Sequence, residues 1–223
     1  MTAPLMIVAI LFSAAVAWRR RRTTQGLRAD AVIVSPRRST TIARDGEVRS
    51  AQSAELTLNP SDLENLWSPA NLENLARTYW QWLSRVTLGL IRVSYRERSR
   101  SVIVLVRALT MLRFDAPEYT LEPDHGAVRW RIRDGLLVAR AGRGSGYLSL
   151  DVRRAGFDDR GRARLKIEVE VANFYPSIAV GFSVPVYEMT QSAIHVLVTN
   201  GFLRSLAKLD LAKSKVGQLS DRT

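Results

Sequence analysis

The stretch that decides the fold is Arg164–Ala172, which reads Arg-Leu-Lys-Ile-Glu-Val-Glu-Val-Ala. Its leucine, isoleucine and valine residues alternate with charged ones. Successive side chains of a β-strand point to opposite faces, so the alternation predicts a strand with one buried and one solvated face. Such strands are typical of antiparallel sheets, which pack one face against a core.

The same alternation recurs in the segments before this strand. In 127–132, Val128, Trp130 and Ile132 alternate with arginines, and 147–152 has the same pattern. Short Gly- and Asp-containing segments between them have the composition of turns. We expect further strands at 101–106, 110–114, 119–121 and 136–140. The sequence therefore predicts an antiparallel β-meander with one buried face.

Two helices are predicted before the meander. Ser61-Asp62-Leu63-Glu64 has the pattern of a capping box, and Ser68-Pro69 places proline at the first position of a second helix. From Leu72 to Val86, apolar and aromatic residues recur at spacings of three and four, as in an amphipathic helix. This aromatic face packs on the sheet or lies in the membrane interface; we favour the sheet.

A long C-terminal helix is predicted from about Pro185 to Leu209. Gly201 lies inside it and costs about 1 kcal/mol relative to alanine, so we expect a neighbour packed closely against this glycine.

The N-terminus has the pattern of a membrane anchor. The apolar run Pro4–Trp18 is followed directly by four arginines. As a helix it rises about 22 Å, and flanking residues help it cross a hydrocarbon core of about 30 Å. A signal peptide carries its positive charge before the apolar core, whereas here the charge follows it. The positive-inside rule predicts a single-pass cell-membrane protein, with the N-terminus outside and the body cytoplasmic. Secretion and a buried core helix are the alternatives.

The net charge of +12 is concentrated near this segment. Residues 19–49 contain nine arginines and three carboxylates. Beside a bilayer this excess favours contact with anionic lipid headgroups, worth about 1 kcal/mol per basic residue. The alternatives are a solvated linker that only enforces topology and, less favoured, a nucleic-acid-binding arm. The residues assigned to the membrane surface are Arg19, Arg20, Arg21, Arg22 and Arg28. The absence of cysteine fits a reducing compartment.

We therefore predict an α+β chain with four parts. An N-terminal transmembrane helix with its basic stop covers 1–22, and a basic juxtamembrane linker covers 23–60. An α+β domain, an antiparallel meander gripped by the long C-terminal helix, covers 61–212, and a flexible tail covers 213–223.

Two stretches resemble the START/Bet v 1-like (SRPBCC, helix-grip) superfamily. The first is the strand that ends in Asn173-Phe174-Tyr175-Pro176, and the second is the helical stretch His195–Arg204. The resemblance covers roughly Leu88 to Leu209. It departs from the superfamily outline in two respects: a long aromatic helix precedes the first strand, and no helix pair separates the first and second strands. The resemblance implies an apolar ligand held between sheet and helix.

A stripe on the last helix is the candidate ligand site, because it mixes polar and apolar side chains. In a helix-grip fold it would line a cavity, with its polar members fixing the polar end of a ligand. The alternative for His195 is a hydrogen-bonded residue at the helix edge. The stripe consists of Tyr187, Gln191, His195, Val198 and Phe202.

No residue set identifies a catalytic, metal or cofactor site, and no catalytic set of the superfamily is present. His125 lies in a turn, where we expect it to be hydrogen-bonded or exposed. Gly142–Gly146 resembles a phosphate loop, but a strand rather than a helix follows it. Asp158 and Asp159 lie in a turn and are expected to be solvated or to cap amides.

These features favour a membrane-tethered cytoplasmic domain that binds an apolar or amphipathic, lipid-like ligand without catalysis. The alternative is an accessory or scaffold subunit of an integral membrane protein complex. An exposed patch containing Tyr79, Trp80 or Trp82 would favour that alternative.

Overall fold

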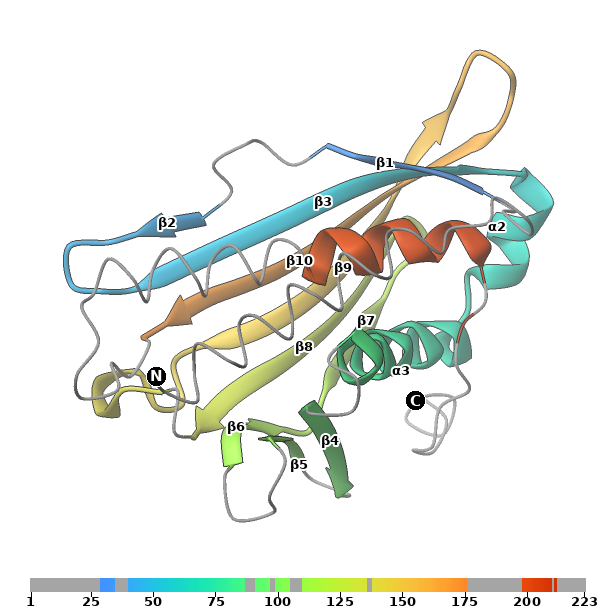
Figure 1. Cartoon of the computed structure of the whole chain (residues 1–223). Helices are drawn as coiled ribbons and strands as arrows, with labels where there is room; N and C mark the ends of the chain where they lie inside the picture. Colours follow the sequence, from blue (N-terminus) through green and yellow to red (C-terminus); the bar gives the residue numbers. More distant parts are fainter. Residues whose placement is uncertain are drawn as a thin grey trace.

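The computed structural model describes residues 29–34, 40–86, 91–96, 99–104, 110–135, 138–175, 198–209 and 211. A long antiparallel sheet dominates the molecule, and the helices lie against one of its faces (Figure 1). The strands are β1 (Ala29–Ile33), β2 (Thr40–Ile42), β3 (Val48–Leu58), β4 (Ile91–Arg96), β5 (Ser99–Val104), β6 (Thr110–Asp115), β7 (Glu118–Leu121), β8 (His125–Asp134), β9 (Tyr147–Phe157) and β10 (Ala163–Phe174).

The strands follow the order β1-β3-β10-β9-β8-β6-β5-β4, with β2 beside β3 and β7 beside β8. The described helices are α2 (Pro60–Leu66), α3 (Pro69–Val86), a C-terminal helix over 198–205, and the short 3-10 turns η1 (Arg140–Gly142) and η2 (Leu206–Lys208). The α+β class and the antiparallel sheet with a C-terminal helix are therefore confirmed.

The alternation that predicted the meander is confirmed in β8, β9 and β10. Val128, Trp130 and Ile132 are buried against the helices, while the arginines between them are exposed. The buried positions are aligned between neighbouring strands. Val128 of β8 lies opposite Leu150 of β9, and Leu150 lies opposite Val169 of β10. One face of the sheet is thus a continuous apolar floor.

The segment predicted as a linker over 23–60 differs most from expectation. It contributes β1, β2 and β3, and β3 is hydrogen-bonded to β1 on one side and β10 on the other. The inner face of β3 carries Ser50 and Gln52 before Ala54, Leu56 and Leu58, and all five are buried. The polar pair obscures the alternation, so the strand is not evident in the sequence.

The presence of strands before the helices also changes the comparison with the helix-grip outline. The helices α2 and α3 now lie between β3 and β4, where the sequence indicated no helix pair. The aromatic helix no longer precedes the first strand. Both expected departures from the outline are therefore corrected, and the element order is three strands, a helix pair, the meander and a C-terminal helix.

Two local predictions are also wrong. The helix α2 begins at Pro60, with Asn59 as N-cap and no side-chain cap, so Ser61 lies inside the helix and forms no capping box. A proline is favourable in the first helical turn, which explains the earlier start. The strand expected at 136–140 is absent from its described part, where Val138 forms an isolated bridge and η1 begins at Arg140.

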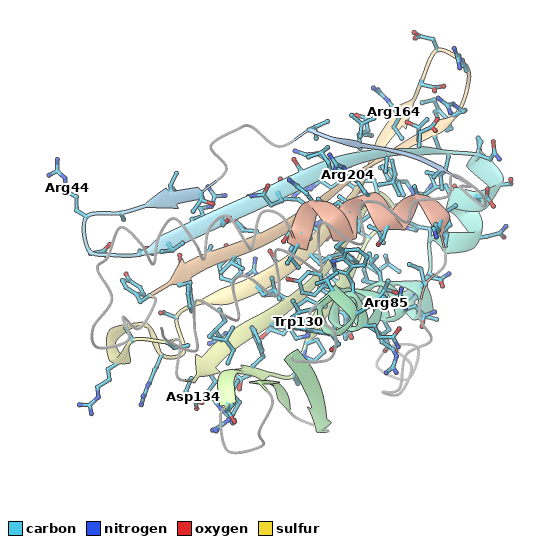
Figure 2. The ribbon with its side chains drawn as sticks, in the orientation of Figure 1. Arg44, Arg85, Trp130, Asp134, Arg164 and Arg204 are labelled. Carbon is cyan, nitrogen blue, oxygen red and sulfur yellow. The ribbon has the colours of Figure 1, made fainter. Side chains whose placement is uncertain are left out.

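The aromatic face of α3 packs against the sheet. Tyr79, Trp80 and Trp82 are 5%, 3% and 5% exposed. The ring of Trp80 meets the ring of Trp130 edge to face, with centroids 5.2 Å apart. Trp130 lies between the sheet and α3 (Figure 2). The core position of this helix is confirmed, and the aromatic patch that would favour an accessory subunit is not exposed.

The close neighbour expected at Gly201 is Trp82. A Cβ atom at position 201 would lie 2.9 Å from Cζ2 of Trp82. The indole Nε1 donates a hydrogen bond to the Val198 carbonyl at 3.0 Å, which fixes the ring over the helix. The predicted span 185–197 of this helix lies outside the described residues.

The predicted membrane anchor over 1–22 also lies outside the described residues. Within the part of the chain that the structure describes, no helix combines the length and apolar character needed to cross a bilayer.

Candidate functional site

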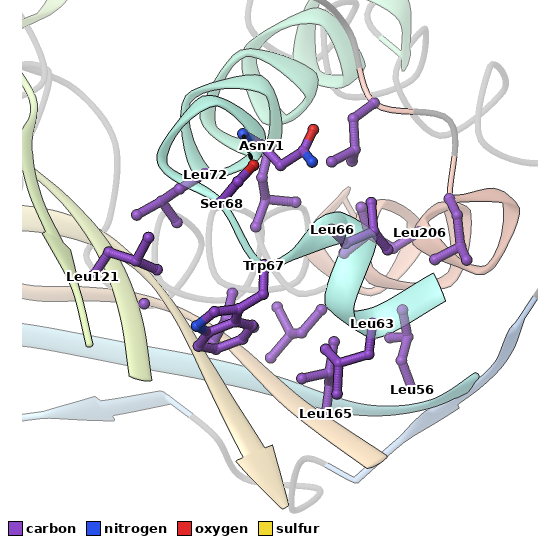
Figure 3. A pocket seen from close by; sticks show the side chains of 16 residues that line it. Leu56, Leu63, Leu66, Trp67, Ser68, Asn71, Leu72, Leu121, Leu165 and Leu206 are labelled. Carbon is purple, nitrogen blue, oxygen red and sulfur yellow. Dashed lines mark hydrogen bonds between the residues drawn. The ribbon is translucent and has the colours of Figure 1, made fainter. Parts of the chain in front are cut away.

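An apolar cavity of about 70 Å³ lies between the sheet and the helices (Figure 3). We call it the leucine pocket, because leucines make up most of the 16 residues that line it. Leu56, Val152, Leu165 and Ile167 form its floor on β3, β9 and β10, and Gly126 lies at its edge on β8. Val152, Leu165 and Ile167 belong to the inner face that the alternation predicts, whereas Leu56 lies on β3, which the sequence did not predict.

The helices form the walls of the leucine pocket. Leu63 and Leu66 come from α2, and Leu72 and Leu75 come from α3. The last wall consists of Leu206, Leu209 and Leu211 from the end of the C-terminal helix. Leu209 adopts the left-handed conformation, with φ of 52°, directly after η2. This conformation ends the helix and redirects the chain toward the pocket.

The polar rim of the leucine pocket is at the corner between α2 and α3. Ser68 and Asn71 are the polar members of the lining. Ser68 Oγ accepts a hydrogen bond from the Asn71 amide at 3.3 Å, and Asn71 Nδ2 donates to the Asn65 carbonyl at 3.0 Å. Among the described residues that line the cavity, none has a charged side chain. The lining therefore suits hydrocarbon, with neutral polar groups at one edge only.

The volume limits what the leucine pocket can hold. Ligand pockets for drug-sized molecules typically enclose about 300–1,000 Å³, and an engineered cavity of about 150 Å³ binds benzene. At about 70 Å³, the leucine pocket has room for the end of an unbranched hydrocarbon chain, not for a whole lipid.

A charged cluster flanks the pocket beyond its floor. Arg154 follows Val152 by two residues on β9 and thus faces the same side. Its Nη1 and Nη2 donate to the two carboxylate oxygens of Glu64 at 2.7 and 3.2 Å. Its guanidinium carbon lies 4.6 Å from the ring centroid of Trp67, and Trp67 Nε1 donates to the Glu122 carbonyl at 3.0 Å. We call Arg154, Glu64 and Trp67 the Arg154 cluster.

Two buried polar groups lie in the core, one on the C-terminal helix and one on α3. Thr199 is fully buried, and its hydroxyl oxygen has no hydrogen-bond partner among the described residues. The same is true of Nε1 of Trp80, which is 3% exposed. Buried polar atoms are nearly always paired, so each of these groups can accommodate a polar atom from water or from a ligand.

Two members of the predicted ligand stripe are described. Phe202 is fully buried, and its ring centroid lies 5.1 Å from that of Tyr79. Val198 is partly buried against the core. Neither lines the leucine pocket. Tyr187, Gln191 and His195 lie outside the described residues, so the stripe stays a prediction.

The predicted membrane-surface arginines are also outside the described residues; they are Arg19, Arg20, Arg21, Arg22 and Arg28.

Sequence reasoning missed most of the leucine pocket and the Arg154 cluster. Leu165 and Ile167 were on the predicted buried face. Trp67, Asn71 and Arg154 were not singled out, because nothing local indicates that the corner between two helices approaches the end of β9. The repeated Leu-Glu-Asn-Leu at 63–66 and 72–75 was the available signal, since both copies supply pocket residues.

Other candidate groups have structural roles. His125 Nε2 and Asp151 Oδ2 lie 2.7 Å apart, which confirms that His125 is hydrogen-bonded. In the glycine-rich loop, the amides of Gly142 and Gly144 donate to the carbonyls of Ala139 and Ile132. These two amides are therefore not available to a phosphate. Among the described residues, no group of three or more potential ligand side chains could hold a metal ion.

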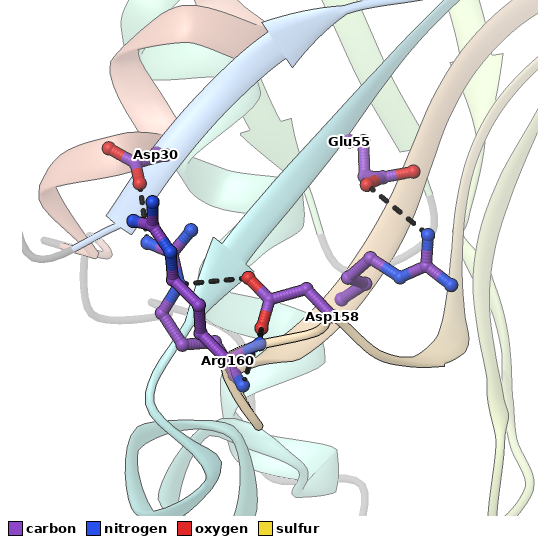
Figure 4. Close-up of polar contacts among 6 residues, drawn as sticks. Asp30, Glu55, Asp158 and Arg160 are labelled. Carbon is purple, nitrogen blue, oxygen red and sulfur yellow. Dashed lines mark hydrogen bonds and ion pairs between the residues drawn. The ribbon is translucent and has the colours of Figure 1, made fainter.

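The turn between β9 and β10 is held by Asp158 (Figure 4). Its Oδ1 accepts from the amides of Arg162 and Arg160 at 2.8 and 2.9 Å, and its Oδ2 accepts from Nε of Arg162 at 2.9 Å. The Arg162 amide, aided by the Arg160 amide and the Arg162 guanidinium, keeps the pKa of Asp158 below its usual value. Arg162 also pairs with Asp30 on β1 at 2.6 Å. The expectation that Asp158 caps amides is confirmed.

No protein-family model matches this chain, and no curated protein is significantly similar to it. Among solved structures, it is similar to a conserved protein of unknown function from Enterococcus faecalis, at 10% identity over 80% of this chain and 81% of that one, with a TM-score of 0.31. An uncharacterized protein from Rhizobium leguminosarum is 13% identical over 70% of this chain and 98% of its own, with a TM-score of 0.30.

A third similar structure is Ara h 8.0201, a protein with the Bet v 1 fold. It is 11% identical over 73% of this chain and 99% of its own, with a TM-score of 0.30.

Proposed function

We propose that this chain is a membrane-tethered cytoplasmic domain that binds the apolar chain of a lipid-like ligand between its sheet and its helices, without catalysis. The leucine pocket carries this proposal, since its lining is aliphatic and it lies between the two layers. The element order resembles that of the helix-grip superfamily, whose members commonly hold apolar ligands at this position.

Burial of hydrocarbon drives the proposed binding. Removing apolar surface from water is worth about 25 cal/mol per Å², from which the costs of association are subtracted. The leucine pocket takes the end of the chain. The polar end is assigned to Tyr187, Gln191 and His195, with Val198 and Phe202 beside them. The buried hydroxyl of Thr199, which has no hydrogen-bond partner among the described residues and follows His195 by four residues in the sequence, supports a polar contact along this segment.

The proposed anchor would keep the leucine pocket close to the bilayer. Ten residues separate Trp18 from Ala29, where β1 begins, and even fully extended they span no more than about 36 Å. Ala29 lies opposite Leu58, at the end of β3 that leads into α2. In this arrangement the basic segment contacts anionic headgroups through its arginines, and the ligand comes from the inner leaflet.

Filling the leucine pocket tests the proposal. A Cβ atom at Gly126 would lie 3.3 Å from Cδ1 of Leu121 and 3.6 Å from Cδ1 of Leu72. Gly126→Val therefore adds apolar bulk at the edge of the cavity, against two leucines of its lining, and the Leu121 side chain must shift by a few tenths of an ångström to accept it. Ala127→Val, the next residue, points to the opposite face of the sheet and is the matched control.

The measurement is mass spectrometry of small molecules that copurify with the full chain from native membranes. We expect a stoichiometric lipid-like molecule with the wild type and Ala127→Val, and at least about tenfold less with Gly126→Val. Wild-type protein without any such molecule would contradict the proposal. If an integral membrane protein copurified in its place, the chain would be an accessory subunit.

A further inference from the structure

The helix α2 forms one wall of the leucine pocket. Leu63 and Leu66 project into the cavity from α2, and Trp67 follows at its end. Figure 3 shows α2 lying across from the sheet residues Leu56 and Leu165, with the cavity between them. A displacement of α2 away from the sheet would therefore open the pocket without disturbing its floor.

On its own, α2 is a weak helix. It has seven residues and no side-chain N-cap, and its last turn contains no basic residue. Isolated helices shorter than about 12–15 residues are marginal in water, so the position of α2 depends on tertiary contacts. Its leucines supply the apolar contacts, and the polar ones include the Arg154 cluster and the hydrogen bond from Asn71 Nδ2 to the Asn65 carbonyl.

The Arg154 cluster connects this weak helix to a rigid strand. Arg154 belongs to β9, and its amide donates to the Asp124 carbonyl at 2.9 Å. Its guanidinium forms a two-pronged contact with Glu64 on α2 and stacks on Trp67 at the end of α2. Paired bonds of this kind fix orientation as well as distance. Arg154 thus holds both the middle and the end of α2.

The Arg154 ion pair adds only modestly to the apolar contacts that hold α2, since Leu63 of α2 is itself buried in the core. The side chain of Glu64 is 66% exposed, and exposed ion pairs contribute little net stability. In addition, Nε of Arg154 is buried and has no acceptor among the described residues. A contact that is specific in geometry yet weak in energy is suited to opening and closing.

We infer that α2 is a gate on the leucine pocket and that Arg154 is the positioning residue that holds it closed through Glu64 and Trp67. The inference rests on the proposed function, since it assigns the control of ligand entry to the same pocket. Breaking the Arg154 cluster opens the gate in the free and the bound protein alike. Ligand entry and exit both become faster, while the affinity barely changes.

The variant Arg154→Met tests the gate, because it keeps an apolar stem and removes the guanidinium. Arg153→Met is the matched control. Arg153 is the adjacent residue, lies on the opposite face of β9 and has its own ion pair, with Asp151 at 2.9 Å. Both variants are made in the full chain, held in amphipol.

Hydrogen exchange is the first measurement and needs no ligand. The amides of Leu63 and Trp67 donate to the carbonyls of Asn59 and Leu63, and they report on α2. We expect them to exchange at least about fivefold faster in Arg154→Met than in the wild type or in Arg153→Met, with α3 unchanged. Unchanged exchange at these two amides would overturn the gate.

Stopped-flow binding of cis-parinaric acid, a linear fluorescent fatty acid, is the second measurement. Energy transfer from the protein's tryptophans distinguishes bound probe from probe dissolved in amphipol. In Arg154→Met we expect both rate constants to rise about fivefold and Kd to change by less than about twofold. Binding with unchanged rate constants would overturn the gate and leave the ligand-binding function standing. No binding to the wild type would overturn the ligand-binding function and, with it, the gate.

Discussion

At the residue scale, the sequence indicates that a residue has a close neighbour or a hydrogen-bond partner, but it does not always indicate which residue that is. A glycine inside the last helix predicts a close neighbour, and the structure identifies that neighbour as Trp82. An aspartate in a turn predicts capped amides, and the structure shows Asp158 accepting two of them. The partner was predictable for Asp158, because it is local. For Gly201 it was not, because helix–helix pairing depends on the whole fold.

Asp158 gives a pH prediction at this scale. Its pKa is lowered in the folded state, chiefly by the amide of Arg162, so its ionised form stabilises the fold. That contribution is fully present above the unfolded pKa of about 3.9 and is lost as the pH falls through the lower folded pKa. We therefore expect Asp158→Asn to be less stable than wild type at pH 5–7 and to approach it below about pH 3.

Urea unfolding of the full chain across this pH range provides the measurement. Asp159→Asn is the control, since Asp159 lies in the same exposed turn and caps neither amide. A stability difference between Asp158→Asn and wild type that stayed constant down to pH 3 would contradict the assigned role.

At the element scale, strands with clean alternation were predictable and strands with a mixed inner face were not. β8 and β10 bury apolar residues at every second position along most of their length. β3 instead buries Ser50 and Gln52 in its first half, although it is flanked by strands on both sides. The missed strand also displaced the helix pair from its proper place in the element order. The strands missed before α2, of which β3 is the longest, thus account for both apparent departures from the helix-grip outline.

The strand β1 can be tested with a matched pair of substitutions. Ile33 packs against the core, whereas its neighbour Val32 is 60% exposed on the opposite face. Threonine is β-branched like both and suits a strand. We expect Ile33→Thr to lower the free energy of unfolding by about 1–2 kcal/mol, through lost apolar burial and a buried hydroxyl, and Val32→Thr to change it by less than about 0.5 kcal/mol. Denaturant titration would detect the difference, and equal effects would indicate that 29–33 is a linker.

At the scale of the whole molecule, the sequence predicted the layers but not the pocket between them. Amphipathic periodicity predicts which face of a helix or strand is buried, and these predictions were correct for α3 and the meander. The leucine pocket depends on β3, the corner after α2 and a left-handed residue at 209, which come together only in three dimensions. For the same reason, Arg154 could not be distinguished in the sequence from the other arginines of β9 and β10.

Topology is the prediction that concerns the whole molecule, because a cytoplasmic ligand site requires the folded body to lie inside the cell. Four arginines that follow the apolar run oppose its translocation, so the N-terminus should be outside and the sheet inside. The chain contains no cysteine, so a single introduced cysteine is the one site that a thiol reagent can label. Thr2→Cys reports on the N-terminus, and Asp159→Cys reports on the exposed turn between β9 and β10. With a membrane-impermeant maleimide, we expect intact cells to label Thr2→Cys, and Asp159→Cys to react only after permeabilisation. Labelling of Asp159→Cys in intact cells would place the folded body outside, and the leucine pocket could then take its ligand only from the outer leaflet or the surrounding medium.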